Sequence, residues 1–292
     1  MIPTTLRGSL AALAGSILAI GLFAQTAPKL ELPVPSQAAT VKQRVGVTDI
    51  EINYSRPSMK GRKIFGEFLP YGVLWRTGAN TATKISFSTP VNFGGTEVPA
   101  GDYGLFTIPG KDEWTVILNK IPGQWGSYAY AEKDDVLRVK VKPIALATPY
   151  ESFTIGLNDL REDSATLNLL WENTRVQVKL TVDTLGMVVP KVEAFMASDE
   201  KKTPEAYFGA AMFYYENNHD LKKALTWVDA GLALKPDAFY MVYRKGLILA
   251  KLGDKAGAVA AAKQSLEMVA KMNGELKDEY TRLNNALIAS VK

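Results

Sequence analysis

The sequence SRPSMKGRKIFGEFLPYGVLWRTGANTATKISF, residues 55–87, has a composition that sets it apart from the rest of the chain. Its glycines, prolines and arginines are too frequent for a plain strand or helix. Its aromatic and aliphatic residues are too frequent for a disordered linker. The stretch therefore predicts a pair of long ordered loops that lead into a strand. We expect the chain that follows to form the scaffold of these loops.

Short segments of alternating apolar and polar residues flank this stretch, and such alternation is typical of antiparallel β-sheet. Ile50, Ile52 and Tyr54 precede it, and residues 137–141 and 175–182 follow the same pattern. Further strand candidates lie at residues 84–88, 103–108, 114–119, 152–157 and 165–171, with Gly, Pro, Asn and Asp turns between them. The turn at residues 109–112 predicts a hairpin. These features predict an antiparallel β-sandwich or barrel-like domain over residues 41–184.

The last part of the chain has a helical, alanine-rich pattern, separated from the β domain by a predicted linker at residues 185–203. Thr203, Pro204 and Glu205 combine an N-cap, a proline at the first helical position and an acidic first turn. Helices are expected at residues 204–217, 220–234, 238–252, 254–272 and 275–291. The fold class is therefore a β domain followed by an all-α domain.

Small residues recur in this helical segment at a spacing of 34 residues, as in Ala224 and Ala258 or Gly231 and Ser265. Over residues 204–292 the pattern resembles the tetratricopeptide repeat, with the final helix as a cap. This resemblance implies a concave surface for a protein or peptide partner. The alternative is a generic stack of helical hairpins.

The beginning of the chain has the pattern of an export signal. Residues 1–27 combine Arg7, an apolar run at 10–23 and small residues at the exit. Residues 28–40, with three prolines, predict an extended tether. We expect a periplasmic or secreted protein with no membrane span after signal removal. The alternative is an uncleaved N-terminal anchor.

The composition excludes several kinds of chemistry. A net charge of +4 without a concentrated basic stretch gives no indication of nucleic-acid binding. The absence of cysteine excludes disulfides, thiolate catalysis and cysteine-ligated metals. The single histidine, His219, lies in a polar segment that predicts a solvated turn. No phosphate-binding glycine loop appears, so nucleotide chemistry by that route is not expected. With no cysteine, one histidine and no EF-hand spacing, we expect no cofactor and no metal.

The candidate ligand-binding residues combine guanidinium forks, an ammonium group, an amide and aromatic rings. They are Arg56, Lys60, Arg62, Trp75, Arg76, Asn80, Trp125 and Tyr128. Arginine matches the geometry of a carboxylate or phosphate, and aromatic rings stack on sugars or line grooves. We therefore expect a small anionic or glycan-like ligand. The alternative is that the arginines brace the loops and the aromatic rings pack in the core.

Binding without catalysis is the leading hypothesis, and two others compete with it. The first is an envelope hydrolase that acts on glycans through paired carboxylates such as Glu67 or Asp102 near Arg76. The second is a purely structural envelope component. Two carboxylates in one cleft would favour the hydrolase, whereas a cleft of Arg, Trp and Asn favours binding.

Four motifs follow one another in the β domain: the stretch at residues 55–87, PAGDYGLFTIPGKDEWTVILN, WGSYAY and DVLRVKV. In this order they resemble the family catalogued as domain of unknown function 2911, over residues 41–182. That family is found mainly in exported proteins of Gram-negative bacteria, and a helical repeat extension fits proteins of this type. The resemblance implies no activity and no catalytic residue. It implies that segments 56–62 and 75–81 belong together as defining loops.

Overall fold

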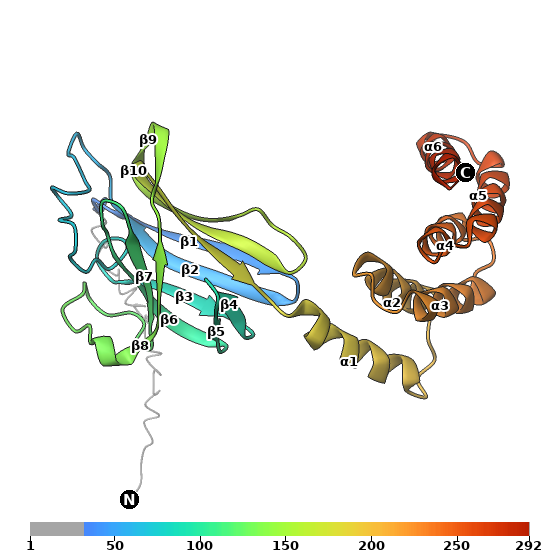
Figure 1. The fold of residues 1–292 in the computed structure, drawn as a ribbon, viewed down its shortest axis with the longest axis horizontal. Coiled ribbons are helices and arrows are strands. Elements are labelled where there is room, and N and C mark those ends of the chain that lie inside the picture. The colour runs from blue at the N-terminus through green and yellow to red at the C-terminus, as the bar shows by residue number, and fades with distance from the viewer. Residues whose placement is uncertain (1–31, 292) are drawn as a thin grey trace, which may run out of the picture. The chain divides into compact units, whose positions relative to one another are not determined.

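The computed structural model describes residues 32–291, where β-strands precede helices as the sequence predicts (Figure 1). Strands occupy residues 37–181 and α-helices occupy residues 184–290. The predicted signal peptide, residues 1–27, and the first residues of the predicted tether lie outside the described residues. Within residues 32–291, no helix has the length and apolar character needed to cross a membrane.

Six antiparallel strands form the first sheet, in the order β1-β2-β3-β6-β7-β8. They are β1 (Gln37–Val45), β2 (Thr48–Arg56), β3 (Thr83–Phe87), β6 (Gly101–Ile108), β7 (Trp114–Asn119) and β8 (Asp135–Val141). The predicted hairpin is confirmed, since Ile108 pairs with Thr115. The tether prediction is wrong from Gln37 onward, because β1 already pairs with β2 there.

Four antiparallel strands form the second sheet, in the order β5-β4-β10-β9. They are β4 (Val91–Phe93), β5 (Thr96–Val98), β9 (Ile144–Asn158) and β10 (Ser164–Thr181). The sequence predicts only a turn at residues 92–95, whereas Gly94 and Gly95, both with positive φ, close a two-residue hairpin between β4 and β5. Strand β10 joins two predicted strands, and the register shifts around Glu172 explain the break in their pattern.

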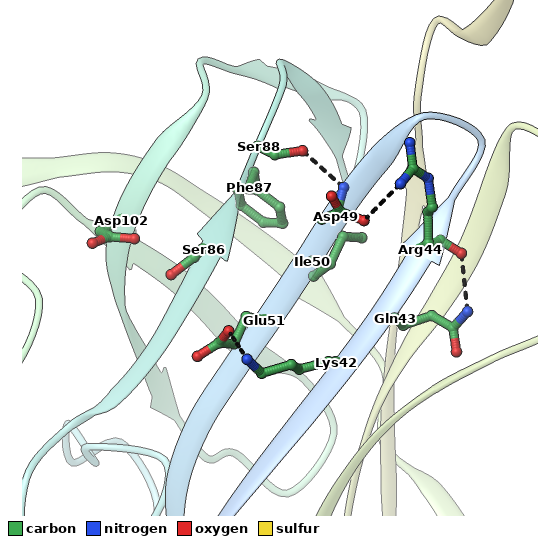
Figure 2. Close-up of a pocket in the computed structure, with 10 residues that line it drawn as sticks. All are labelled: Lys42, Gln43, Arg44, Asp49, Ile50, Glu51, Ser86, Phe87, Ser88 and Asp102. Carbon is green, nitrogen blue, oxygen red and sulfur yellow. Dashed lines mark hydrogen bonds and ion pairs between the residues drawn. The ribbon is translucent and has the colours of Figure 1, made fainter.

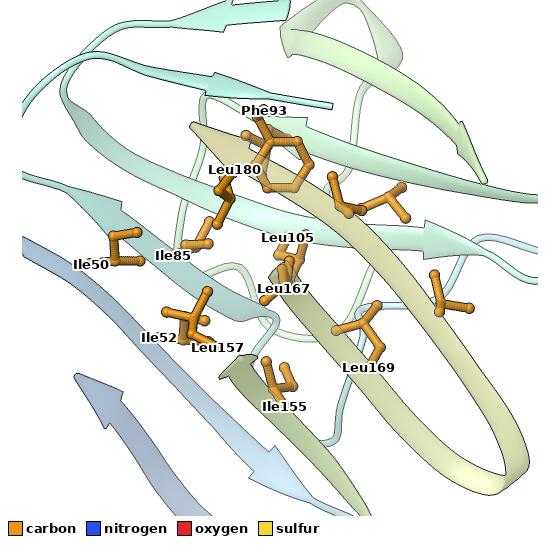
Figure 3. Packing of buried hydrophobic residues seen from close by; sticks show 14 of the residues in the cluster. Ile50, Ile52, Ile85, Phe93, Leu105, Ile155, Leu157, Leu167, Leu169 and Leu180 are labelled. Atoms are coloured by element: carbon orange, nitrogen blue, oxygen red, sulfur yellow. The ribbon is translucent and has the colours of Figure 1, made fainter. Parts of the chain in front are cut away.

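The two sheets enclose one apolar core, so the β domain is a sandwich (Figure 3). Ile50, Ile52 and Ile85 contribute from the first sheet, and Leu167 and Leu180 contribute from the second. These are the inward positions that the alternating patterns predict. Burial of each such side chain stabilises the fold by about 1.5–3 kcal/mol, so the alternation determines which face of each strand is buried.

The described helices are α1 (Thr184–Ala197), α2 (Pro204–Glu216), α3 (Leu221–Leu234), α4 (Phe239–Lys251), α5 (Lys255–Ala270) and α6 (Glu275–Ser290). The bounds of α2 to α6 lie within two residues of the predicted ones. The Thr203 side chain caps α2 by accepting a hydrogen bond from the backbone of Ala206, as predicted.

Helix α1 lies in the segment 185–203 that the sequence predicts as a linker, so this prediction is wrong for most of the segment. The Asp183 side chain caps the helix by accepting a hydrogen bond from the Gly186 N–H at 2.8 Å. Pro190 lies inside the helix, and this proline conceals the helical pattern in the sequence. The Glu193 carboxylate ties α1 to the following helices, since it accepts hydrogen bonds from the Tyr214 hydroxyl and the Lys223 ammonium, both at 2.6 Å.

Small residues lie where helices α2 to α6 approach one another. A Cβ added at Gly231 of α3 would lie 3.3 Å from the Pro204 carbonyl oxygen of α2. One added at Gly246 of α4 would lie 2.9 Å from a methyl group of Leu287 and 3.3 Å from the Ala258 carbonyl oxygen. Gly231, one of the recurring small residues, and Gly246 therefore lie at helix–helix contacts.

Candidate functional site

The loop at residues 57–82 is attached to both sheets. The Pro57 carbonyl accepts a hydrogen bond from Phe153 N at 2.9 Å, and Met59 N donates to the Glu151 carbonyl at 2.8 Å. Further along, Trp75 and Thr107 exchange two backbone hydrogen bonds of 2.7 and 2.9 Å. The loop is thus bound to β9 at its start and to β6 near its end. The structure confirms the prediction of an ordered loop.

Two carboxylates hold this loop from the second sheet. Glu151 accepts a hydrogen bond from the Lys60 backbone N–H at 2.9 Å. Glu172, at the irregular point of β10, accepts one from the Phe65 backbone N–H at 3.1 Å. Loop backbone donors away from strand pairing need such partners. Both carboxylates therefore support the loop conformation.

A second loop, residues 120–131, runs beside residues 78–82 of the first. Ala82 N donates to the Gln124 carbonyl at 2.8 Å, and Gly126 N donates to the Asn80 carbonyl at 3.0 Å. Gly126 has φ +65°, and a Cβ there would lie 2.7 Å from the Tyr128 ring and 3.2 Å from Arg76 Nη1. Glycine is therefore required where the second loop meets the guanidinium group.

A cavity of about 220 Å³ is lined by residues of the two loops and of strand β10. Its apolar wall consists of Pro57, Phe68, Leu69, Leu74, Trp75 and Trp171. The rings of Trp75 and Trp171 are stacked, with centroids 5.7 Å apart. Trp75 is 6% exposed and Trp171 is 1% exposed, so the core holds both rings in place. Ser127, Gly78 and Ala79 complete the wall together with Arg76.

Arg76 gives this cavity its charge. Its side-chain Nε is buried and makes no hydrogen bond within the described part of the chain. Among residues 32–291 no carboxylate forms an ion pair with Arg76, and the described residues that line the cavity include no Asp or Glu. A buried donor without a partner is costly. With one cationic and no acidic residue in its described lining, the cavity favours an anion over a cation.

Five of the predicted ligand-binding residues lie in or beside the cavity. Trp75 and Arg76 line it, and Asn80, Trp125 and Tyr128 lie on the loop segments around Arg76. Trp125 is 67% exposed and Tyr128 is 84% exposed, so neither ring belongs to the core. The Asn80 side chain donates to the Ser55 hydroxyl at 3.3 Å, which joins the loop to the end of β2.

The other three predicted residues do not line the cavity. Arg56 donates to the Phe153 carbonyl at 3.0 Å and to the Thr154 hydroxyl at 2.7 Å, so it braces β2 against β9. Arg62 donates to the Ser58 and Met59 carbonyls and lies 4.0 Å from the centre of the Phe68 ring. Lys60 is exposed, at the start of the same loop. For the two arginines the structure favours the bracing alternative.

Phe68, Leu74 and Ser127 line the cavity and are not among the ligand-binding residues predicted from the sequence. Phe68 and Leu74 lie inside the stretch at residues 55–87, and Ser127 lies inside the WGSYAY motif. These two motifs therefore indicate where in the sequence the residues that line the cavity are found. From the sequence, Trp171 could either line a groove or pack in the core; it is 1% exposed and reaches the cavity from strand β10.

A second hollow, of about 590 Å³, lies on the outer face of the first sheet and contains three carboxylates (Figure 2). Each of them has a cationic partner: Asp49 with Arg44 at 3.6 Å, Glu51 with Lys42 at 2.9 Å and Asp102 with Lys84 at 3.0 Å. Hydrogen bonds from Asn53 and Lys42 lower the pKa of Glu51, and those from Ser86 and Lys84 lower the pKa of Asp102.

A glycoside hydrolase needs one carboxylic acid whose pKa is raised, so that it can donate a proton. The pKa values of Glu51 and Asp102 are lowered, so neither carboxyl group meets this requirement. The third carboxylate considered from the sequence, Glu67, is exposed and pairs with Lys63 at 3.5 Å. These carboxylates give no support to the hydrolase hypothesis.

Comparison with known proteins gives one match. No curated protein and no solved structure matches this chain. A family model described as protein of unknown function (DUF2911) matches residues 36–180, which is the β-sandwich with both loops. The helices α1 to α6 lie beyond the matched residues. The resemblance inferred from the four motifs is thus confirmed for this segment, and the β domain of the chain is a match to the DUF2911 family.

Proposed function

We propose that this chain is an exported envelope protein whose β domain binds a small anion in the Arg76 cavity, without catalysis. The observation that carries the proposal is the guanidinium group of Arg76, which lines the cavity without an ion-pair partner among the described residues and with no Asp or Glu in the described lining. A bound carboxylate or phosphate would accept hydrogen bonds from the guanidinium fork and offset the cost of burying it. Ser127, which also lines the cavity, adds a hydroxyl group.

The experiment is a thermal-shift titration of residues 28–292 with phosphate, small carboxylates and peptidoglycan fragments. We expect at least one anion to raise the Tm in proportion to the logarithm of its concentration. The shift should disappear in Arg76→Met, which keeps the aliphatic stem and removes the charge. Lys60→Met is the matched control, because Lys60 is an exposed cation on the same loop. A shift that survives in Arg76→Met, or no shift with any anion, contradicts the proposal.

Export is part of the proposal and rests on the signal pattern of residues 1–27 and on the family resemblance of the β domain. The chain would then function in the periplasm or outside the cell. Fractionation of a Gram-negative host, with mass spectrometry of the mature N-terminus, tests this. We expect cleavage between residues 24 and 28. An intact chain in the cytoplasm contradicts it.

The helical segment is proposed to be a tetratricopeptide-like stack that binds a protein or peptide partner. Two observations support this: small residues recur at a spacing of 34 residues, and Gly231 among them lies at a helix–helix contact. Arg244 of α4 forms no ion pair with a carboxylate in the described segment, so it is available to pair with an acidic residue of a partner peptide. Peptide-array binding to Arg244→Glu tests it, with Lys263→Glu on α5 as control. Equal binding by both variants contradicts this surface assignment.

A further inference from the structure

We propose that the Arg76 cavity takes a monocarboxylate with a small apolar body, a single ring or short alkyl chain, in preference to a glycan. This inference rests on the anion site proposed above and specifies the chemical class of its ligand. Three properties of the cavity carry it: the volume, the composition of the wall and the placement of a single cation.

The volume restricts the size of the ligand. The cavity measures about 220 Å³. An apolar protein cavity of about 150 Å³ accepts a benzene molecule. The Arg76 cavity therefore has room for one ring and one carboxylate group. It has no room for a disaccharide, so a glycan would have to remain largely outside.

The wall restricts the polarity of the ligand. Seven of the residues that line the cavity have apolar side chains, Ala79 among them, and they include the stacked pair Trp75 and Trp171. Arg76 and Ser127 contribute the polar side chains. A sugar ring carries several hydroxyl groups, and each one buried against this wall without a hydrogen bond would weaken binding. An apolar ring brings no hydroxyl group that would be left without a hydrogen bond, and the half-exposed Phe68 ring of the wall offers it an aromatic contact.

The single cation restricts the charge of the ligand. The buried Nε of Arg76 makes no hydrogen bond in the described structure, and its Nη1 lies beside Gly126. A carboxylate matches the two parallel donors of a guanidinium edge. The cavity offers one guanidinium group and otherwise mostly apolar side chains, so it suits a ligand with one negative charge. A multiply charged phosphate ester would bring charges that no second cation of the cavity wall neutralises.

This chemistry has two sources: a free carboxylic acid and the C-terminal carboxylate of a peptide with an apolar last residue. The ligand set for isothermal titration separates them. Phenylacetate is the reference compound. Glucuronate keeps the carboxylate and replaces the ring by a polar one, and 2-phenylethanol keeps the ring and removes the charge. Acetyl-Gly-Phe and its amide represent the peptide with and without its terminal carboxylate.

We expect phenylacetate to bind at least about tenfold more tightly than glucuronate, because the apolar ring is buried on binding. We expect 2-phenylethanol to bind at least about tenfold more weakly than phenylacetate, because the charge-assisted hydrogen bonds are lost. Acetyl-Gly-Phe binding that is lost in the amide would assign peptide C-termini as a source. Binding of phenylacetate without binding of acetyl-Gly-Phe would assign free acids. Both results support the proposed class.

Variants of residues 28–292 complete the test. Arg76→Met should abolish phenylacetate binding, whereas Lys60→Met should leave it unchanged. Ala79→Leu, which fills part of the cavity and keeps Arg76, should also abolish it. This variant keeps the test decisive if Arg76→Met fails to fold.

Glucuronate binding that depends on Arg76 and equals or exceeds phenylacetate binding would overturn the ligand class and leave the anion site intact. The absence of Arg76-dependent binding of any anion would overturn both proposals. Phenylacetate binding that is unchanged in Ala79→Leu would place the ligand outside the cavity and overturn the inference.

Discussion

Three glycines inside helices give a quantitative test of the packing of the helical segment. Gly209 of α2 has no atom within 4 Å of the place where a Cβ would be added. At Gly231 the closest atoms lie at 3.3 Å, and at Gly246 the closest atom lies at 2.9 Å, with the Ala258 carbonyl oxygen at 3.3 Å. The methyl group added by Gly→Ala therefore has a different amount of free space at each of the three positions.

The expected changes follow from two opposing effects. Each substitution gains helix propensity of about 1 kcal/mol, since alanine loses less backbone entropy than glycine. At Gly209 nothing opposes this gain, so Gly209→Ala should stabilise the protein by about 0.5–1 kcal/mol. At Gly246 the added methyl overpacks the contact at a cost of about 1–3 kcal/mol, so Gly246→Ala should be destabilising by about 1 kcal/mol. Gly231→Ala should lie between them, near zero.

Hydrogen exchange followed by mass spectrometry measures the effect in α2, α3 and α4 separately, without assuming that the whole chain unfolds in one step. A change of about 1 kcal/mol alters the exchange rate of protected amides about fivefold. Exchange in β6, far along the chain from these helices, is the internal control. If Gly246→Ala protects α4 as well as Gly209→Ala protects α2, the close approach at Gly246 is refuted.

Further predictions concern the β domain and helix α1. Arg56→Met should lower the free energy of unfolding by about 2 kcal/mol, since two acceptors on β9 lose a charged donor; an unchanged urea midpoint would contradict the brace. Trp171→Ala should cost about 3–5 kcal/mol, measured the same way, and a smaller loss would mean that the wall of the cavity collapses around the gap. Hydrogen bonds from Lys223 and Tyr214 lower the pKa of Glu193. The stability that this carboxylate adds is therefore present above the ordinary carboxyl pKa and is lost as the pH falls through the lowered value in the folded state. The faster exchange expected in α1 of Glu193→Gln at neutral pH should disappear in acid, and a difference that grows in acid would reverse the sign of this argument.

Local patterns in the sequence were sufficient for most of the secondary structure. The alternation around Ile52 and Val178 identifies the buried face of two strands, and Thr203 with Pro204 identifies the start of α2. Each of these signals depends on residues a few positions apart. The two adjacent glycines at Gly94 and Gly95 are also a local signal, and a two-residue hairpin forms where the sequence predicts only a turn.

The errors arise where the decisive contact is distant in the sequence. Helix α1 contains Pro190 and is held by Tyr214 and Lys223, which belong to later helices. Arg56 and Arg76 have the same chemistry and lie in the same stretch. No local pattern shows that Arg56 donates to a carbonyl and a hydroxyl group of β9, whereas the Nε of Arg76 is buried without a partner among the described residues. The sequence alone therefore located the region of the site and did not separate its braces from its cavity.

The cavity wall has a consequence for the order of events during synthesis. Pro57 and Trp75 are made long before Ser127 and Trp171, yet all four line the same space. Contacts between such distant positions require closure of long loops, which slows folding and places these contacts late. A nascent chain, or one truncated before residue 171, contains Arg76 but lacks Trp171 and therefore part of the cavity wall. The proposed binding of an anion therefore requires the last strand of the sandwich, and fragments that end before it are expected not to bind.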